Sequence, residues 1–548
     1  MEILQVVLLF LVFLTSAVSM FLRKIPALIA LPLMAFFIPV IAGVSINDTI
    51  QFVLGAGAIR LSEAYTIAIF GSMLSVLLQK TGIAESFIKI GAELSGDKPW
   101  TIALLMLILI SLLFTTLGGL GAIIMVATVV LPIMASAGIG SVTTAGIFLI
   151  GLSLGGIFNV GNWAVYISIL GLKIEEVRSF AFIIFGITFV VGLLYITIML
   201  YRDGHDIDFK KIIIRSLIFG IIISALLYFY YTLSTDIKNN IFFMLGKIGS
   251  IFKWIIAAAI ILLFIASTFR ASLNKNENGL HWISYFTPFI PLFLILIFNM
   301  NFIASFIVGL LYGFISTYKK RSLNVFVKSM LEGGSVVMPA VALMLGIGML
   351  LNAVIGPPTS GYSATALFND VGKAEILLPK DFRTADNAKN LLLKFQDQKD
   401  IKTEFKNDSL IIISGIQAKD IKYEVKYWPV LNILKPVFKN IIPDNPISYI
   451  IIFFLLAPLA LYRGPLNVWG MGFGMAAIFL ASGMPAGAIM GLLLSVGQIQ
   501  GISDPTNTQN VWLANEVRVD VQKILWNTIP YTWLVALLGL TASAIMFM

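Results

Sequence analysis

The feature that most constrains this chain is a succession of apolar runs, each long enough to cross a lipid bilayer. A transmembrane helix needs about 20 consecutive apolar residues. A chain of 548 residues that is 59% hydrophobic and 12% charged is not typical of any soluble globular protein of this size. The sequence therefore predicts an all-α polytopic membrane protein with about twelve spanning helices. We expect these helices at residues 4–22, 26–44, 62–79, 143–170, 178–201, 211–232, 251–268, 282–298, 302–317, 334–355, 486–515 and 527–548.

Two further apolar blocks, 100–138 and 446–483, are too long for one helix and are interrupted near their centres by glycine or proline. The interruptions are LGGLGA at Leu117–Ala122 and YRGPLN at Tyr462–Asn467. Each block predicts a re-entrant hairpin, in which two half-length helices meet at a tip and return to the same side. Irregular backbone at membrane depth is tolerated only where protein or a water-filled cavity surrounds it. The two tips are therefore candidate parts of a functional site.

The second half of the chain repeats features of the first half at an offset of 345 residues. At this offset D-P-T-N, which begins at Asp504, lies over N-V-G-N, which begins at Asn159. The span at 334–355 matches the one at 62–79 at a smaller offset of about 275, and the difference indicates an insertion. The basic loops place the starts of the two units on opposite sides of the membrane. Inverted repeats with discontinuous helices are typical of secondary transporters.

The repeats and the insertion define the predicted domain organisation. The insertion is dense in charge, and its pattern predicts a small α/β domain with a helix at 382–398 and strands at 409–416 and 421–427. It is interpreted either as a solvated extracytoplasmic decoration or as a part with a gating or substrate-collecting role. The predicted divisions are the first inverted repeat at 1–201 (hairpin 100–138, broken helix 143–170), linking helices at 202–281, the start of the second repeat at 282–356, the insertion at 357–432 and the rest of the second repeat at 433–548 (hairpin 446–483, broken helix 486–515).

Charge and composition exclude several classes of function. The formal net charge is +9, but the basic residues lie in short loops between apolar runs, which is the positive-inside pattern and not a nucleic-acid footprint. Arg60, Lys173 and Arg178 are exceptions on the predicted outer side. The absence of cysteine and the presence of only two histidines argue against a thiolate or histidine metal centre. We therefore expect no enzyme activity, no cofactor and no metal other than Na⁺.

Polar and glycine residues at the tips and helix breaks are the candidate substrate ligands. Half-helix N-termini attract anions, glycines let the backbone approach a ligand, and a guanidinium at a tip is a bidentate anchor for a carboxylate. The alternatives are packing for the glycines, and snorkelling or pairing with Asp504 for the arginine. The predicted substrate-binding residues are Gly118, Gly119, Asn159, Asn162, Arg463, Gly464, Asn467, Thr506 and Asn507.

Asp504 is the acidic side chain in the second helix break, and the first break carries none. A carboxylate at membrane depth is costly and marks a functional site. We therefore predict that Asp504, Asn159 and Thr508 couple transport to a cation. The alternative is that Asp504 caps the second half-helix, with Pro505 at its first position. The two interpretations are compatible.

A re-entrant hairpin followed by a broken helix with Asn and Thr at the break, as at Thr506-Asn507-Thr508, resembles the ion transporter superfamily. This group includes gluconate permeases, citrate transporters, divalent-anion/sodium symporters and sodium–proton antiporters. The resemblance covers about 51–201 and 325–548 and implies a dimeric, elevator-type, cation-coupled carboxylate carrier.

The predicted function is secondary active uptake of a small organic carboxylate, coupled to H⁺ or Na⁺, across a bacterial-type inner membrane. The bilayer and a second copy of the chain are the expected partners. One alternative is a cation–proton antiporter in which Asp504 binds the cation and Arg463 is its internal partner. A second is a membrane sensor or enzyme that acts through the insertion.

Overall fold

The computed structural model divides the chain into two compact units. Unit 1 comprises Met1–Ser62, Ala342–Asn445 and Trp469–Pro485, and unit 2 comprises Glu63–Val341, Pro446–Val468 and Ala486–Met548. The structure describes residues 2–22, 24–93, 96–207, 232, 235–273, 280–319, 322–356, 373–377, 402–407, 410–414, 428–430, 433–434, 442–443, 445–481 and 483–548.

The described residues form the apolar helices that a polytopic membrane protein requires. Eight of these helices are long and apolar enough to cross a membrane, and a bent pair adds a ninth if it is one broken span. That pair is α9 (Ser141–Ile157) and α10 (Val160–Leu170), bent by 52° within the predicted broken helix 143–170. Five more apolar helices have 10–17 residues, and the predicted span at 211–232 lies outside the described residues. The expectation of an α-helical, multi-pass membrane protein is confirmed at this level.

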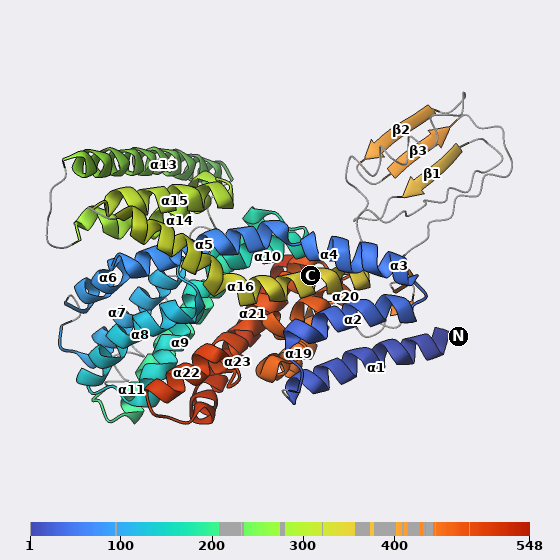
Figure 1. The fold of residues 1–548 in the computed structure, drawn as a ribbon, viewed down its shortest axis with the longest axis horizontal. Coiled ribbons are helices and arrows are strands. Elements are labelled where there is room, and N and C mark those ends of the chain that lie inside the picture. Colours follow the sequence, from blue (N-terminus) through green and yellow to red (C-terminus); the bar gives the residue numbers. More distant parts are fainter. Residues whose placement is uncertain are drawn as a thin grey trace. The chain divides into compact units, whose positions relative to one another are not determined.

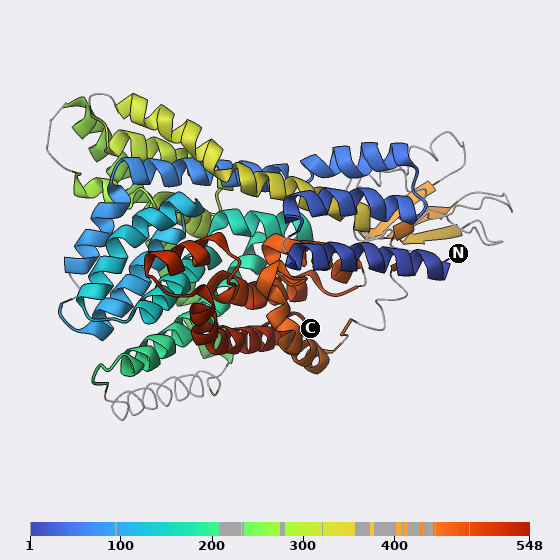
Figure 2. The ribbon, with the colours of Figure 1, turned by 60° about the horizontal axis from the view of Figure 1, so that its bottom comes forward.

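In unit 1, the N-terminal helices lie side by side in both views (Figure 1; Figure 2). The π-helix η1 releases backbone carbonyls from the usual helical pattern, and the Asn352 amide donates to one of them, the Phe52 carbonyl, at 2.9 Å. Arg60 donates to the Asn352 side chain at 2.5 Å. The helices that lie wholly or partly in this unit are α1 (Glu2–Phe21), α2 (Ala27–Ile41), α3 (Ile46–Asp48), η1 (Thr49–Gly55), α4 (Ala56–Ile59), α16 (Ser322–Ile355), η5 (Val468–Gly472) and α20 (Phe473–Ala481).

The insertion contains a three-stranded antiparallel sheet with strand order β1-β3-β2. Its strands are β1 (Lys373–Leu377), β2 (Lys402–Asn407) and β3 (Leu410–Ser414). The predicted strand at 409–416 contains β3, whereas the predicted helix at 382–398 and strand at 421–427 lie outside the described residues. After the insertion, the Trp428 indole donates to the Ala353 carbonyl at 2.7 Å. The chain therefore returns next to the end of α16, where the insertion begins.

Unit 2 contains both helices of the first predicted hairpin, the first arm of the second one and the helices of both breaks. It also contains a group formed by α13, α14 and α15, which pack on one another (Figure 1). Its elements are α5 (Ser62–Lys80), α6 (Ile83–Glu93), α7 (Pro99–Phe114), α8 (Gly119–Ser136), α9, α10, α11 (Ile174–Arg202), α13 (Thr235–Ser272), η2 (Trp282–Phe286), α14 (Phe289–Phe298), α15 (Phe302–Ser316), the first part of α16, α19 (Pro446–Leu456), η4 (Ala457–Arg463), α21 (Ala486–Ser503), α22 (Thr508–Glu516) and α23 (Val521–Phe547).

Glycines bring α16 into backbone contact with neighbouring helices in both units. In unit 1, a Cβ added to Gly57 would lie 2.6 Å from the Met349 Cα. In unit 2, a Cβ added to Gly333 would lie 2.5 Å from the Met73 Cα. Gly57 and Gly333 are 276 residues apart, and so are Met73 and Met349. The same close approach therefore occurs twice at the smaller of the two repeat offsets.

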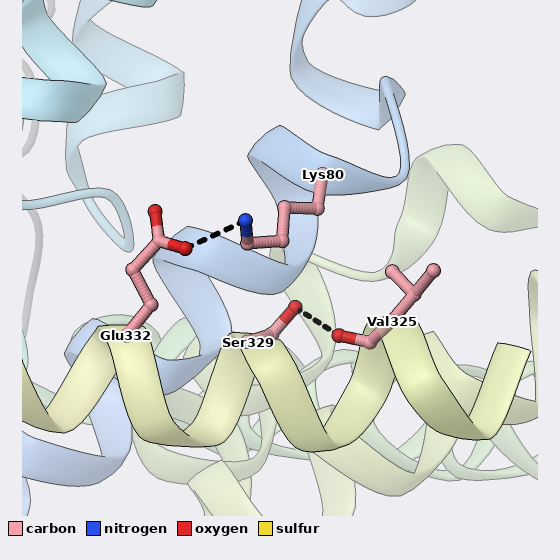
Figure 3. A network of polar contacts seen from close by, with 4 residues as sticks. All are labelled: Lys80, Val325, Ser329 and Glu332. Atoms are coloured by element: carbon pink, nitrogen blue, oxygen red, sulfur yellow. Dashed lines mark hydrogen bonds and ion pairs between the residues drawn. The ribbon is translucent and has the colours of Figure 1, made fainter.

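An ion pair joins α5 to α16 in unit 2 (Figure 3). The Lys80 ammonium lies 2.6 Å from the Glu332 carboxylate, and both side chains are partly exposed to solvent. One turn earlier in α16, the Ser329 hydroxyl donates to the Val325 carbonyl of its own helix at 2.7 Å. Exposed ion pairs contribute about 0–1 kcal/mol, so the glycine contact at Gly333 fixes this crossing more strongly than the charges do.

Candidate functional site

The tip of the first predicted hairpin lies between Phe114, the end of α7, and Gly119, the start of α8. Gly119 has φ +82, a left-handed conformation that glycine adopts without a steric penalty. Ser75 of α5 holds the tip, because its hydroxyl donates to the Gly118 carbonyl at 3.3 Å and accepts from the Gly118 amide at 3.2 Å. The Gln79 side chain donates to the remaining lone pair of this hydroxyl at 3.2 Å.

Asn159 connects this tip to the first helix break. It is the N-cap of α10, and its Oδ1 accepts from the Gly161 amide at 3.0 Å. Its Nδ2 donates to the carbonyls of Phe114 and Leu117, at 3.3 and 3.4 Å. Asn159 thus joins the first helix break to the tip of the first predicted hairpin.

The second tip lies at the end of η4, and its backbone is unusual. Tyr462 and Arg463 have φ values of 55 and 57, so two adjacent residues with Cβ atoms adopt the left-handed conformation. Gly464 follows, and a Cβ there would overlap the Leu459 carbonyl oxygen. The predicted tip, Tyr462–Asn467, coincides with the end of regular helix in this block.

Asp504 lies against the second tip with none of its surface exposed. Its Oδ1 accepts from the Tyr462 amide at 3.1 Å and from the Thr506 amide and hydroxyl at 2.9 and 2.7 Å. Its Oδ2 accepts from the Asn467 amide group at 3.2 Å. All four donors are neutral, so hydrogen bonds and not a salt bridge compensate the burial of this group.

Asn467 contacts the Asp504 carboxylate and Asn510 contacts the Asp504 backbone carbonyl. The Asn467 Nδ2 donates to Asp504 and to the Ala460 carbonyl, and the Asn510 Nδ2 donates to the carbonyls of Ile502 and Asp504. Because every partner is an acceptor, the amide orientation is fixed and each Oδ1 points away from these bonds. Both Oδ1 atoms are buried and accept no hydrogen bond from a described residue. A buried acceptor of this kind is suited to a cation.

The remaining predicted ligands divide between contacts at the breaks and exposed positions. Asn162 and Asn507, which are 345 residues apart, each donate to a carbonyl at the end of the preceding half-helix, Gly156 at 2.9 Å and Gln500 at 2.5 Å. Thr508 is exposed at the start of α22, so the structure does not place its side chain with Asp504.

Among the described residues no hydrogen bond joins Asn159 to Asp504, because each lies at its own helix break and contacts a different predicted hairpin tip. One break carries an asparagine and the other an aspartate because the two tips present different backbone and side-chain groups to them. Asn159 meets two carbonyls and must donate, whereas Asp504 meets a backbone N–H and an amide donor and must accept. The proposed three-residue set of Asp504, Asn159 and Thr508 is therefore not one cluster of contacts.

Arg463 is half-buried at the second tip. In the described part of the chain, no carboxylate lies within ion-pair distance of its guanidinium, and Asp504 accepts only the four neutral bonds given above. The alternative prediction that Arg463 pairs with Asp504 is therefore wrong for this conformation.

Several polar residues that sequence reasoning missed connect the site. The Gln500 Oε1 accepts from the Val468 amide at 2.6 Å and ties the second tip to α21. Ser153 donates to the Gln498 Oε1 at 2.7 Å, and these two residues are also 345 apart. Residues at one repeat position therefore contact each other where α9 and α21 cross. Two glutamines inside an apolar helix were the available signal, because polar groups at membrane depth need a partner.

Comparisons with known proteins give structural neighbours only. No family model matches the chain, and no curated protein matches it. A solved structure of Neisseria gonorrhoeae MtrF, which is described as illuminating a class of antimetabolite efflux pumps, aligns with a TM-score of 0.42 and 10% sequence identity. The alignment covers 95% of this chain and 94% of that chain.

Proposed function

We propose that this protein is a secondary active transporter that couples uptake of an organic carboxylate to H⁺ or Na⁺. In this proposal, two inverted repeats carry re-entrant hairpins, and a dimer in the inner membrane works by an elevator-type mechanism. The observation that carries the proposal is the fully buried Asp504, held between a hairpin tip and a helix break by neutral donors alone.

A buried carboxylate must be paired, bind a cation or take up a proton. Asp504 has no basic partner among the described residues, so its charge rests on four neutral hydrogen bonds and is open to neutralisation by a cation or a proton. The donor-free oxygens of Asn467 and Asn510 support cation binding, since amide oxygens and carboxylates are ligands for hard cations. Neutralisation by either ion lowers the cost of moving this site through the membrane. Substrate transport is then coupled to the ion, because the site crosses the membrane less readily when it is charged and empty than when an ion occupies it.

The substrate class follows from Arg463. A half-buried guanidinium without a carboxylate partner among the described residues offers a bidentate fork that fits a carboxylate. The antiporter alternative uses Arg463 as the internal partner of Asp504, and the absence of that pair in this conformation favours the carboxylate carrier.

Uptake by the purified, reconstituted protein tests the proposal. We expect at least one of a panel of labelled mono-, di- and tricarboxylates to accumulate only when an inward H⁺ or Na⁺ gradient is applied. Removing residues 360–427 keeps Trp428 and its bond to Ala353 and is expected to preserve this uptake. Accumulation that needs no ion gradient would contradict coupling, and loss of all activity in the deletion variant would favour the sensor or enzyme.

Replacing Arg463 with lysine is expected to weaken substrate binding strongly. A point charge cannot reproduce a planar fork, and the lost hydrogen bond to a charged group is worth about 1–3 kcal/mol. The measurement is the apparent substrate affinity in reconstituted uptake. The control is Lys98→Arg at an exposed loop position, which is expected to leave the affinity unchanged. Near-normal affinity in Arg463→Lys would remove Arg463 from the substrate site.

A further inference from the structure

We propose that Asp504 positions Arg463 by holding the second hairpin tip in a strained conformation, and that neutralising the carboxylate releases the tip. The ion site would then control the substrate anchor through the backbone of Tyr462. This inference rests on the proposed function for the roles of Asp504 as the ion site and of Arg463 as the anchor.

The strain is located at two adjacent residues. Tyr462 and Arg463 have φ values of 55 and 57. For a residue with a Cβ, the left-handed conformation is disfavoured by a factor of roughly five to thirty in population. Of the described non-glycine residues with positive φ, only Tyr462 and Arg463 are neighbours in the chain; the others are Asn299 and Arg518.

The first tip shows that a hairpin tip does not require this strain. Its left-handed residue is Gly119, which adopts φ +82 without a Cβ penalty. Leu117 and Gly118, the residues that correspond to Tyr462 and Arg463 at the offset of 345, do not have positive φ. The strain is therefore particular to the repeat that carries the carboxylate.

Hydrogen bonds from both ends of the tip hold it against Asp504. The Tyr462 amide, inside the strained pair, donates to Oδ1 at 3.1 Å, and the Asn467 Nδ2 donates to Oδ2 at 3.2 Å. Hydrogen bonds to an ionised acceptor are roughly twice as strong as those between neutral groups. A proton or a bound cation on the carboxylate weakens the hydrogen bond that Asp504 accepts from the Tyr462 amide. The backbone at Tyr462 can then leave the left-handed region.

Release of the tip changes the position of Arg463. Arg463 follows Tyr462 directly, so a change in the Tyr462 dihedral angles redirects the guanidinium. Ion occupancy at Asp504 thereby changes the direction of Arg463 without any contact between the ion and the substrate, and in a symporter the ion-loaded direction is the one that binds the substrate. Asp504 acts on the substrate as a positioning residue.

Hydrogen–deuterium exchange of the intact protein in lipid nanodiscs tests this mechanism. The readout is the exchange rate of tip amides in peptides covering 457–467, with peptides covering 114–121 from the first tip as the internal reference. Asp504→Asn is expected to speed exchange in the second tip roughly tenfold and to leave the reference unchanged. Unchanged exchange in the second tip would show that Asp504 does not hold it.

A matched pair of substitutions separates strain from every other property of Tyr462. Tyr462→Gly and Tyr462→Ala both remove the phenol, including its 3.5 Å contact with Gln522, but only glycine removes the Cβ penalty. In the Asp504→Asn background, the glycine variant is expected to exchange roughly five- to thirtyfold more slowly than the alanine variant. Equal rates in the two variants would overturn the role of strain.

The exchange experiment gives a result even if Asp504→Asn does not fold or no substrate is found. If Asp504→Asn does not fold, the glycine and alanine variants are compared in the parent chain, where the same order of exchange rates is expected. Exchange needs no substrate, so its outcome is independent of whether a carboxylate is transported. A protein that fails every uptake assay can still show the released tip, and a carboxylate carrier can still show equal rates.

Discussion

Asp504→Asn is expected to abolish uptake driven by an ion gradient while substrate exchange between the two sides of the membrane continues. An asparagine Oδ1 can accept the same three hydrogen bonds from Tyr462 and Thr506, but a neutral acceptor holds them roughly half as strongly as a carboxylate. It cannot change its charge when a proton or cation arrives, so the loaded and unloaded sites cross the membrane equally well. The energy of the gradient is then no longer linked to movement of the substrate.

The structure predicts that Asp504→Asn also lowers the stability of the fold, which would not be expected if Asp504 only capped a helix. Asparagine would place an amide donor against the Asn467 Nδ2, which already donates to Asp504 and to the Ala460 carbonyl. Two facing donors leave a buried group unsatisfied, which costs about 1–3 kcal/mol. We therefore expect a lower thermal stability together with the loss of coupling.

The matched control is Asp520→Asn. Asp520 is an exposed N-cap of α23 that accepts from the Gln522 amide at 2.9 Å. Asparagine caps about as well as aspartate, so this variant is expected to match the parent in stability and uptake. Both variants are measured in the same reconstituted assay, as accumulation under a gradient and as exchange without one. Parental accumulation by Asp504→Asn would leave only the capping role.

The sequence predicted where this chain departs from regular helix, because glycine, proline and clustered polar residues at membrane depth have few structural explanations. The second tip at Tyr462–Asn467 and the break at Asp504 lie where the pattern put them. The first tip begins slightly earlier than predicted, since α7 ends at Phe114 and α8 begins at Gly119. Glycine is compatible with a helix start, so LGGLGA alone did not fix the boundary.

The partners within the site could not be read from the sequence. Whether a tip presents carbonyls or N–H groups depends on its dihedral angles, and these decide that Asn159 donates and Asp504 accepts. Ser75 and Gln500 lie inside helices at no fixed distance in sequence from the tips they hold. Their roles follow from tertiary contacts that local patterns do not encode.

The inserted sheet illustrates a different limit. The run of isoleucines in β3 is typical of a buried strand and was predicted. Strands β1 and β2 contain charged residues at several positions and are only five and six residues long. Their pairing with β3 follows from long-range register, such as Lys373 and Lys402 both facing Ser414. Short strands of this composition do not differ from loops in sequence.

Gly464→Ala is expected to destabilise the protein strongly, whereas Gly118→Ala at the corresponding region of the first tip is expected to leave the folded fraction unchanged. Gly464 has φ −67, which alanine adopts readily, so its backbone conformation is not the obstacle. The obstacle is space, because a Cβ there would overlap the Leu459 carbonyl oxygen, a backbone atom that cannot rotate away. A Cβ on Gly118 meets nothing within 4 Å, and its φ of −157 is ordinary extended backbone.

Overpacking of this kind costs about 1–3 kcal/mol, and at Gly464 the displaced segment includes Arg463 and the Tyr462 amide that binds Asp504. The measurement is the thermal midpoint of detergent-purified protein, followed by size-exclusion chromatography, for the two alanine variants and the parent. Gly464→Ala should lower the midpoint and also abolish both uptake and exchange, since the tip cannot keep its position between Leu459 and Asp504. Equal midpoints for the two alanine variants would mean that the second tip has room to rearrange, and the tight turn at Gly464 would then not be what places Arg463.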